Sequence, residues 1–181
     1  MLKLAVASLA LVSSLVFAGP KVEFETTIGA FTVELNQEKA PLTVANFLKY
    51  VNDGSYVGTQ FHRVIPNFMA QGGGFDKNMK SLPTYAPVQN EASNGLKNNT
   101  ATIAMARTND PNSATRQFFI NFVDNNFLDY DQRPPGYAVF GKVTQGFDVV
   151  QSMSNKRTST QGRYRDVPVE PIIITKATLL K

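Results

Sequence analysis

Apolar and polar residues alternate in VEFETTIGAFTVEL (22–35), which is the pattern of β-strands with one buried face. Strand-like runs follow in GTQFHRVI (58–65), FMAQGGG (68–74), ATIAMA (101–106), QFFINF (117–122), YAVFGKV (137–143) and PIIITKATLL (171–180). Gly29 lies at the turn of the first stretch, which predicts a β-hairpin, and Pro66-Asn67 separates the second stretch from the third. The pattern predicts a mainly β protein.

Two segments have the helical period instead. The first is predicted to begin at Pro41 and to end at Gly54, because the apolar residues Val44, Phe47, Leu48 and Val51 follow at i, i+3, i+4 and i+7. A second, short helix is predicted over 147–154, with Phe147, Val150 and Met153 on one face. Many strands with two helices predict an antiparallel β-barrel, closed so that no edge is exposed, with helices capping its open ends.

The first twenty residues, MLKLAVASLALVSSLVFAGP, follow a different pattern. Lys3 precedes an apolar and small-residue run that ends near Ala18, which is the layout of a cleavable secretory signal. The alternative is a retained membrane anchor, but the run is shorter than the roughly 20 apolar residues of a bilayer span. We expect a signal peptide over 1–18, a single domain over 19–181, and a mature protein in the periplasm with no stable membrane insertion.

Composition excludes several kinds of site. The formal net charge is +4, but the positive residues are scattered, so no nucleic-acid partner is expected. The chain has no Cys and one His, which excludes disulfides and thiolate metal sites and leaves no metal-binding spacing. No cofactor is expected.

The segment FHRVIPNFMAQGGG (61–74) combines apolar side chains with one cation. Strict alternation would place Phe61, Arg63 and Ile65 on one face, where a guanidinium is costly unless its donors are used. With apolar and amide residues of SATRQFFIN (113–121) and NNFLDY (125–130), the segment predicts an apolar pocket with a guanidinium and amides at its rim.

Other interpretations of these residues stay open on pattern alone. Apolar residues at alternating positions are more often core than pocket, and Arg63 would fit an ion pair across a ladder. Gly72 to Gly74 lack the phosphate-loop pattern. His62 has no nucleophile elbow to serve, so we interpret it as structural.

The order and spacing of FHRVIPNFMAQGGG, NEASNGLKN (90–98), TIAMART (102–108), SATRQFFIN, FLD (127–129) and GYAVFGKV (136–143) resemble the cyclophilin family over nearly the whole mature chain. With the signal peptide, the chain is similar to the bacterial periplasmic branch. The resemblance implies a closed eight-stranded antiparallel barrel capped by two α-helices. It also implies peptidyl-prolyl cis–trans isomerase activity on proline-containing peptides and unfolded secreted proteins, by a monomer.

The resemblance also implies roles for single residues. Arg63 would be catalytic, donating to the carbonyl and nitrogen region of the substrate proline, and Gln71 would bind the substrate backbone. The proline pocket would be lined by Phe68, Met69, Phe119 and Leu128, and the groove flanked by Ala106, Arg107 and Gln117.

Three positions depart from the common family pattern. Phe127 stands where many members have Trp, Tyr137 where many have His, and Arg107 where Asn is common. Loss of the indole N–H predicts weak cyclosporin binding with turnover retained. The other two changes affect substrate preference.

Three rival functions were weighed: a cyclophilin-like module that binds proline segments without turnover, a general holdase chaperone, and an unrelated ligand-binding barrel. The presence of Arg63 disfavours the first, because binding alone does not require it. The second predicts exposed apolar surface beyond the pocket.

Overall fold

Ten strands and two α-helices make up residues 19–181, the part of the chain that the computed structural model describes. The predicted signal peptide lies outside these residues. Among residues 19–181, no helix has both the length and the apolar character needed to cross a bilayer. The strands are β1 (Lys21–Thr26), β2 (Gly29–Leu35), β3 (Thr59–Ile65), β4 (Met69–Asp76), β5 (Thr102–Met105), β6 (Phe118–Asn121), β7 (Val139–Gln145), β8 (Thr158–Gln161), β9 (Tyr164–Pro168) and β10 (Ile174–Leu180).

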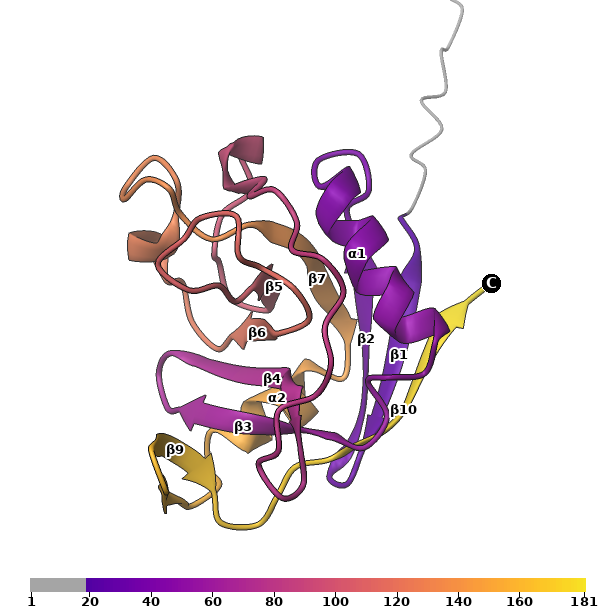
Figure 1. Ribbon diagram of the computed structural model, residues 1–181, viewed down its shortest axis with the longest axis vertical. Helices are drawn as coiled ribbons and strands as arrows, with labels where there is room; N and C mark the ends of the chain where they lie inside the picture. The colour runs from indigo at the N-terminus through magenta and orange to yellow at the C-terminus, as the bar shows by residue number, and fades with distance from the viewer. Residues whose placement is uncertain (1–18) are drawn as a thin grey trace, which may run out of the picture.

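Eight of the strands form one antiparallel sheet in the order β10-β1-β2-β7-β5-β6-β4-β3, which confirms a mainly β, eight-stranded fold. The sheet curls strongly (Figure 1). The prediction of a closed barrel is overstated, because no ladder joins β3 to β10 in the described chain. These edges meet through the bridge between Gln60 and Ile173 and through backbone N–H groups of Gly58 and Phe61. The fold is a half-barrel with a seam.

The remaining two strands, β8 and β9, pair with each other and pack beside β3. The sequence analysis did not predict this hairpin. In Figure 1, β9 lies near the foot of the molecule, below the arrowhead that marks the end of β3. The hairpin therefore adds a polar wall outside the sheet.

Both helices are where the sequence placed them. Helix α1 (Pro41–Asn52) packs against β10, and α2 (Phe147–Met153) packs against β2. Pro41 is the first residue of α1, and the Glu91 carboxylate accepts from the next two backbone N–H groups, of Leu42 and Thr43, at 3.0 and 2.8 Å. Gly54, at φ 73°, follows the helix as predicted.

The connection between β4 and β5 is long and begins after Asp76. Apart from a 3₁₀ turn at Ala92–Asn94 it has no regular structure. Side chains fix it to the rest of the fold: Glu91 binds α1, and the backbone N–H of Tyr85 donates to the Tyr50 hydroxyl at 2.8 Å. The loop is thus built into the fold.

The sheet separates two apolar clusters. The large interior cluster contains Ile103 and Met105 from β5 and Phe118 and Ile120 from β6. The intervening residues, Ala104 and Phe119, belong to a small second cluster on the other face. Because successive strand residues point to opposite faces, one pair of strands supplies both the core and an outer surface.

The predicted alternation in β3 is wrong at one point. Phe61 pairs with Gly72 and Arg63 pairs with Gln71, so two residues of β3 advance against one residue of β4. This bulge at His62 places Phe61 and Val64 in the interior cluster, whereas Ile65 packs in the outer one. Arg63 therefore does not share a face with Phe61.

Candidate active site

Four residues form a row across the outer face of the sheet. Arg63 on β3 lies opposite Gln71 on β4, Gln71 lies opposite Phe119 on β6, and Phe119 lies opposite Ala104 on β5. Side chains directly opposite each other on antiparallel strands have Cβ atoms about 5 Å apart. The register alone thus brings the cation, an amide and an aromatic ring together.

A cavity of about 150 Å³ opens over this row. Its walls are nine residues that the sequence analysis singled out: Arg63, Phe68, Met69, Gln71, Ala106, Arg107, Phe119, Leu128 and Tyr137. Met69 and Phe119 are buried and form its floor. The cavity is small, with apolar residues on its floor and charged and amide groups on a comparable part of its wall.

Hydrogen bonds orient the polar groups on that wall. The Gln71 amide donates through Nε2 to Oε1 of Gln117 at 2.8 Å, and its own Oε1 lies 3.5 Å from Nη1 of Arg63. Within residues 19–181, no carboxylate lies within ion-pair distance of Arg63. The cross-ladder ion pair that the pattern left open is therefore not formed. Most guanidinium donors of Arg63 stay available to a ligand.

Close packing explains two of the three consecutive glycines. A Cβ at Gly74 would stand 2.5 Å from Cγ of Gln117, and a Cβ at Gly73, where φ is +84°, would stand 2.9 Å from the Tyr56 ring. Any side chain at residue 74 would displace Gln117 and with it the Gln71 amide. Gly74 therefore gives room to the amide pair, whereas Gly73 gives room to the aromatic core.

A buried polar network holds the segment with Phe127 and Leu128. The backbone N–H of Asn98 donates to Oδ1 of Asp129 at 2.7 Å, and Nδ2 of Asn125 donates to the Phe68 carbonyl at 3.0 Å. These contacts fix both ends of the 3₁₀ turn Asn126–Leu128. Phe127, which is 54% exposed, lies outside the cavity wall with its ring 5.6 Å from that of Phe68.

Arg107 and Tyr137 form the opposite wall. Nε and Nη2 of Arg107 both donate to the Gly136 carbonyl, at 3.0 and 2.9 Å, and the guanidinium lies 4.3 Å from the centre of the Tyr137 ring. The Tyr137 ring meets Phe119 edge to face at 5.8 Å. Arg107 therefore positions Tyr137, a role that the sequence analysis did not foresee when it assigned Arg107 only a charge in the groove.

Two other groups were absent from the sequence prediction. Buried Arg116, next to Gln117, donates to the carbonyls of Ser55, Gly73 and Pro83. Buried Asn98, Asn121, Asn125 and Asp129 make the network behind Phe127. Their signal was a run of amides and two carboxylates in NNTA and NFVDNNFLD, but loops also have that composition.

His62 is buried beside the site and does not enter it. Its ring meets Phe75 edge to face at 4.6 Å, and burial lowers the pKa of His62 from 6.5 to about 4. The imidazole is neutral at pH 7, as expected of a group in an apolar environment.

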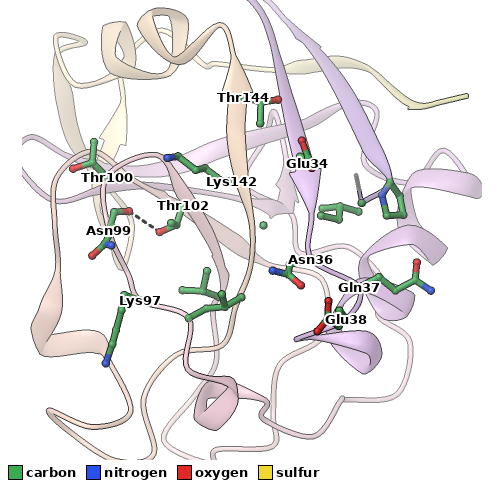
Figure 2. Close-up of a pocket in the computed structure, with 16 residues that line it drawn as sticks. Glu34, Asn36, Gln37, Glu38, Lys97, Asn99, Thr100, Thr102, Lys142 and Thr144 are labelled. Carbon is green, nitrogen blue, oxygen red and sulfur yellow. Dashed lines mark hydrogen bonds between the residues drawn. The ribbon is translucent and has the colours of Figure 1, made fainter. Parts of the chain in front are cut away.

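A larger cavity, of about 750 Å³, lies over β2, β5 and β7 (Figure 2). Its charged residues have both signs: Glu34, Glu38, Lys97 and Lys142. Two of these charges already have partners, because Glu34 lies 3.6 Å from Lys21 and Lys97 pairs with Asp131. The cavity has no concentration of one charge or of reactive groups, and none of the predicted site residues lines it.

Comparisons with known proteins agree with this geometry. The family model described as cyclophilin type peptidyl-prolyl cis-trans isomerase/CLD matches residues 21–179. The chain is 54% identical to a peptidyl-prolyl cis-trans isomerase of Acinetobacter baylyi, over 91% of this chain and 87% of that one. It is 48% identical to peptidyl-prolyl cis-trans isomerase B of Escherichia coli, over 87% and 98% of the two chains. A cyclophilin type isomerase of Cryptosporidium parvum has a similar structure, with a TM-score of 0.72 at 25% identity over 90% and 98% of the chains.

Proposed function

This chain belongs to the cyclophilin-type peptidyl-prolyl cis-trans isomerases, and we propose that its active site is the cavity beside Arg63, with Arg63 as the catalytic residue. The reaction is rotation about the bond that precedes a proline. The observation that carries the assignment is a cavity of about 150 Å³ with an apolar floor and, on its wall, the Arg63 guanidinium, which has no carboxylate partner within residues 19–181. A cavity of that size suits a single ring rather than a folded domain.

The chemistry of the bond sets what the site must supply. Resonance between the amide nitrogen and the carbonyl gives rotation a barrier of about 18–20 kcal/mol. Uncatalysed exchange at proline therefore takes tens to hundreds of seconds. No covalent bond breaks, so the enzyme has only to hold the proline ring and stabilise the twisted amide, in which the lone pair is localised on nitrogen.

Arg63 can stabilise that twisted state. A fixed positive charge near the proline nitrogen favours the localised lone pair over the resonance form, and an arginine stays protonated at any ordinary pH. Gln71, held by Gln117, would bind the substrate backbone beside it. The floor of Met69 and Phe119 would hold the ring, and Ala106, Leu128 and Tyr137 would complete the wall.

Phe127 bears on inhibitor binding. It lies next to Phe68 at the edge of the cavity and has no donor to offer. We expect weak cyclosporin binding for that reason, with proline turnover retained.

We further propose that the substrates are unfolded secreted proteins in the periplasm, reached after cleavage behind Ala18, and that the protein acts as a monomer. The signal-like first twenty residues support the location. The structure of the Cryptosporidium parvum relative in the presence of the dipeptide Ala-Pro supports short proline segments as ligands.

The test is isomerisation of a short Xaa-Pro-Phe peptide by the mature protein, with Arg63→Ala and Arg63→Lys measured beside the wild type. Removal of one preorganised donor to a developing charge typically costs about 10²–10³ in rate. We expect a loss of that size in kcat/KM for Arg63→Ala and partial retention for Arg63→Lys. Unchanged thermal unfolding would show that the variants are folded.

The rival module that binds proline segments without turnover predicts a different result. Its wild type would bind the peptide and leave the exchange rate at its solvent value. Such an outcome would overturn the assignment of Arg63 as catalytic.

A further inference from the structure

A second cavity, of about 550 Å³, adjoins the proline cavity and is lined by residues of the β8–β9 hairpin. The two cavities share Arg63 and Gln71. The other lining residues are His62, Phe75, Gln117, Arg163, Tyr164, Arg165 and Asp166. Consecutive Cα atoms of a peptide are 3.8 Å apart, and the two cavities share a wall. A peptide with its proline in the small cavity therefore places a neighbouring residue over the larger one.

The charge of this cavity is uneven. Three arginines, Arg63, Arg163 and Arg165, face one carboxylate, that of Asp166. Within residues 19–181 no arginine of the cavity lies within ion-pair distance of a carboxylate. The imidazole of His62 is neutral at pH 7 and adds no charge. The cavity has a net positive charge, although the scattered charges elsewhere show no such bias.

The hairpin that carries Arg163 is anchored to the wall of the site. The Tyr164 ring meets Phe75 edge to face at 5.0 Å, and Phe75 meets His62 in the same way at 4.6 Å. Nη2 of Arg163 donates to the Tyr164 hydroxyl at 3.0 Å, with its guanidinium 5.1 Å from the ring centre. This aromatic series holds the charge of Arg163 beside the cavity.

Building on the proposed function, we propose that this cavity is a subsite for an acidic side chain next to the substrate proline, with Arg163 and Arg165 as specificity-determining residues. A carboxylate on the residue flanking the proline would be attracted by both exposed guanidinium groups. Asp166 opposes this attraction and limits it. The subsite selects among proline-containing segments and leaves the rotation itself to the small cavity.

The experiment compares kcat/KM for two matched peptide series, Ala-Xaa-Pro-Phe-Ala and Ala-Ala-Pro-Xaa-Ala, with Xaa as Glu, Gln or Lys. The cis–trans exchange of the bond before proline is followed by NMR, which needs no coupling protease. The quantity of interest is kcat/KM for the Glu peptide divided by kcat/KM for the Lys peptide. Comparing this ratio between enzyme variants cancels the intrinsic effect of Xaa on the uncatalysed rate.

We expect a ratio of about three to ten in one of the two series for the wild type, the range for partly screened charge pairs. In R163Q/R165Q the ratio should fall to near one. The control K39Q/K142Q removes two exposed lysines far from the site and should keep the wild-type ratio. D166N should raise the ratio, because it removes the opposing carboxylate.

Salt provides an independent check. Raising the salt concentration from 0.1 to 1 M shortens the Debye length from about 10 to about 3 Å. The ratio should then approach one in the wild type and stay unchanged in R163Q/R165Q. A wild-type ratio that R163Q/R165Q leaves intact would overturn the subsite while leaving the isomerase assignment in place. Failure to accelerate any peptide would overturn the proposed function itself.

Discussion

Replacement of Arg116 by Met is expected to destabilise the fold strongly, although the residue lies outside the cavity. Arg116 as a whole is 2% exposed, and its guanidinium donates to three carbonyls: from Nε to Gly73 at 2.6 Å, from Nη1 to Pro83 at 2.7 Å and from Nη2 to Ser55 at 2.5 Å. It also lies 5.1 Å from the centre of the Tyr50 ring. One side chain thus joins β4 to the turn that precedes β3 and to the loop that follows β4.

The magnitude follows from these contacts. Hydrogen bonds to charged groups contribute about 1.5–3 kcal/mol each. The gross loss for three is partly offset, because the variant no longer has to desolvate a guanidinium. Removing one partner of a buried charged interaction typically costs about 3–5 kcal/mol. We expect Arg116→Met to lower the free energy of unfolding by about 4 kcal/mol. Arg116→Lys keeps the charge but loses the planar set of guanidinium donors, and it should lower the free energy of unfolding by roughly half as much.

Urea denaturation of the mature protein measures this loss, and thermal unfolding checks it. A domain of this size loses about 2–4 °C in Tm per kcal/mol, so Arg116→Met should lower Tm by roughly 8–16 °C. The exposed Lys39→Met serves as the control and should change stability by less than about 0.5 kcal/mol. A loss below 1 kcal/mol for Arg116→Met would refute the reasoning, because it would show that water replaces the guanidinium at the three carbonyls without cost.

Three further predictions concern the site and its surroundings. Burial lowers the pKa of His62 from 6.5 to about 4, so the unfolded chain takes up a proton between those pH values and the folded chain does not. The free energy of unfolding should therefore fall by about 2–3 kcal/mol from pH 7 to pH 4.5, and His62→Phe should remove that part of the fall in urea titrations at the two pH values. Phe127→Trp should tighten cyclosporin binding by about tenfold in calorimetry, since one added hydrogen bond contributes about 1.4 kcal/mol; unchanged affinity would contradict the role given to the missing donor. Gln117→Leu leaves Nε2 of Gln71 without its partner at 2.8 Å and should lower kcat/KM by about tenfold with Tm nearly unchanged, whereas equal activity would show that the Gln71 amide needs no positioning.

Much of the fold could be predicted from the sequence, because local physics decided it. Helix α1 follows from apolar residues at helical spacing between Pro41 and Gly54, of which Val44, Phe47 and Val51 are buried and Leu48 is partly buried. The hairpin of β1 and β2 follows from alternation around Gly29. The cavity residues were identified by the resemblance to cyclophilins, and the register of β3, β4 and β6 then brought them together.

The remaining features depend on long-range contacts that a pattern does not encode. The bulge at His62 adds a single residue to β3 and cancels the alternation that put Phe61 and Arg63 on one face. The β8–β9 hairpin is polar and mostly exposed, so no apolar period marks it. The seam between β3 and β10 depends on how far the sheet curls, which the strand sequences do not determine.

The position of the proline cavity on the outer face of the sheet affects how the protein can change over generations. In β5 and β6, one set of alternate residues packs into the interior and the other contacts the cavity cluster. Under the proposed function, a substitution at Phe119 would alter ligand selection without disturbing Phe118 or Met105 in the interior, and the reverse also holds. New substrate preferences can be acquired one side chain at a time in a scaffold that stays intact, and no opening of the sheet is needed for a peptide to enter or leave.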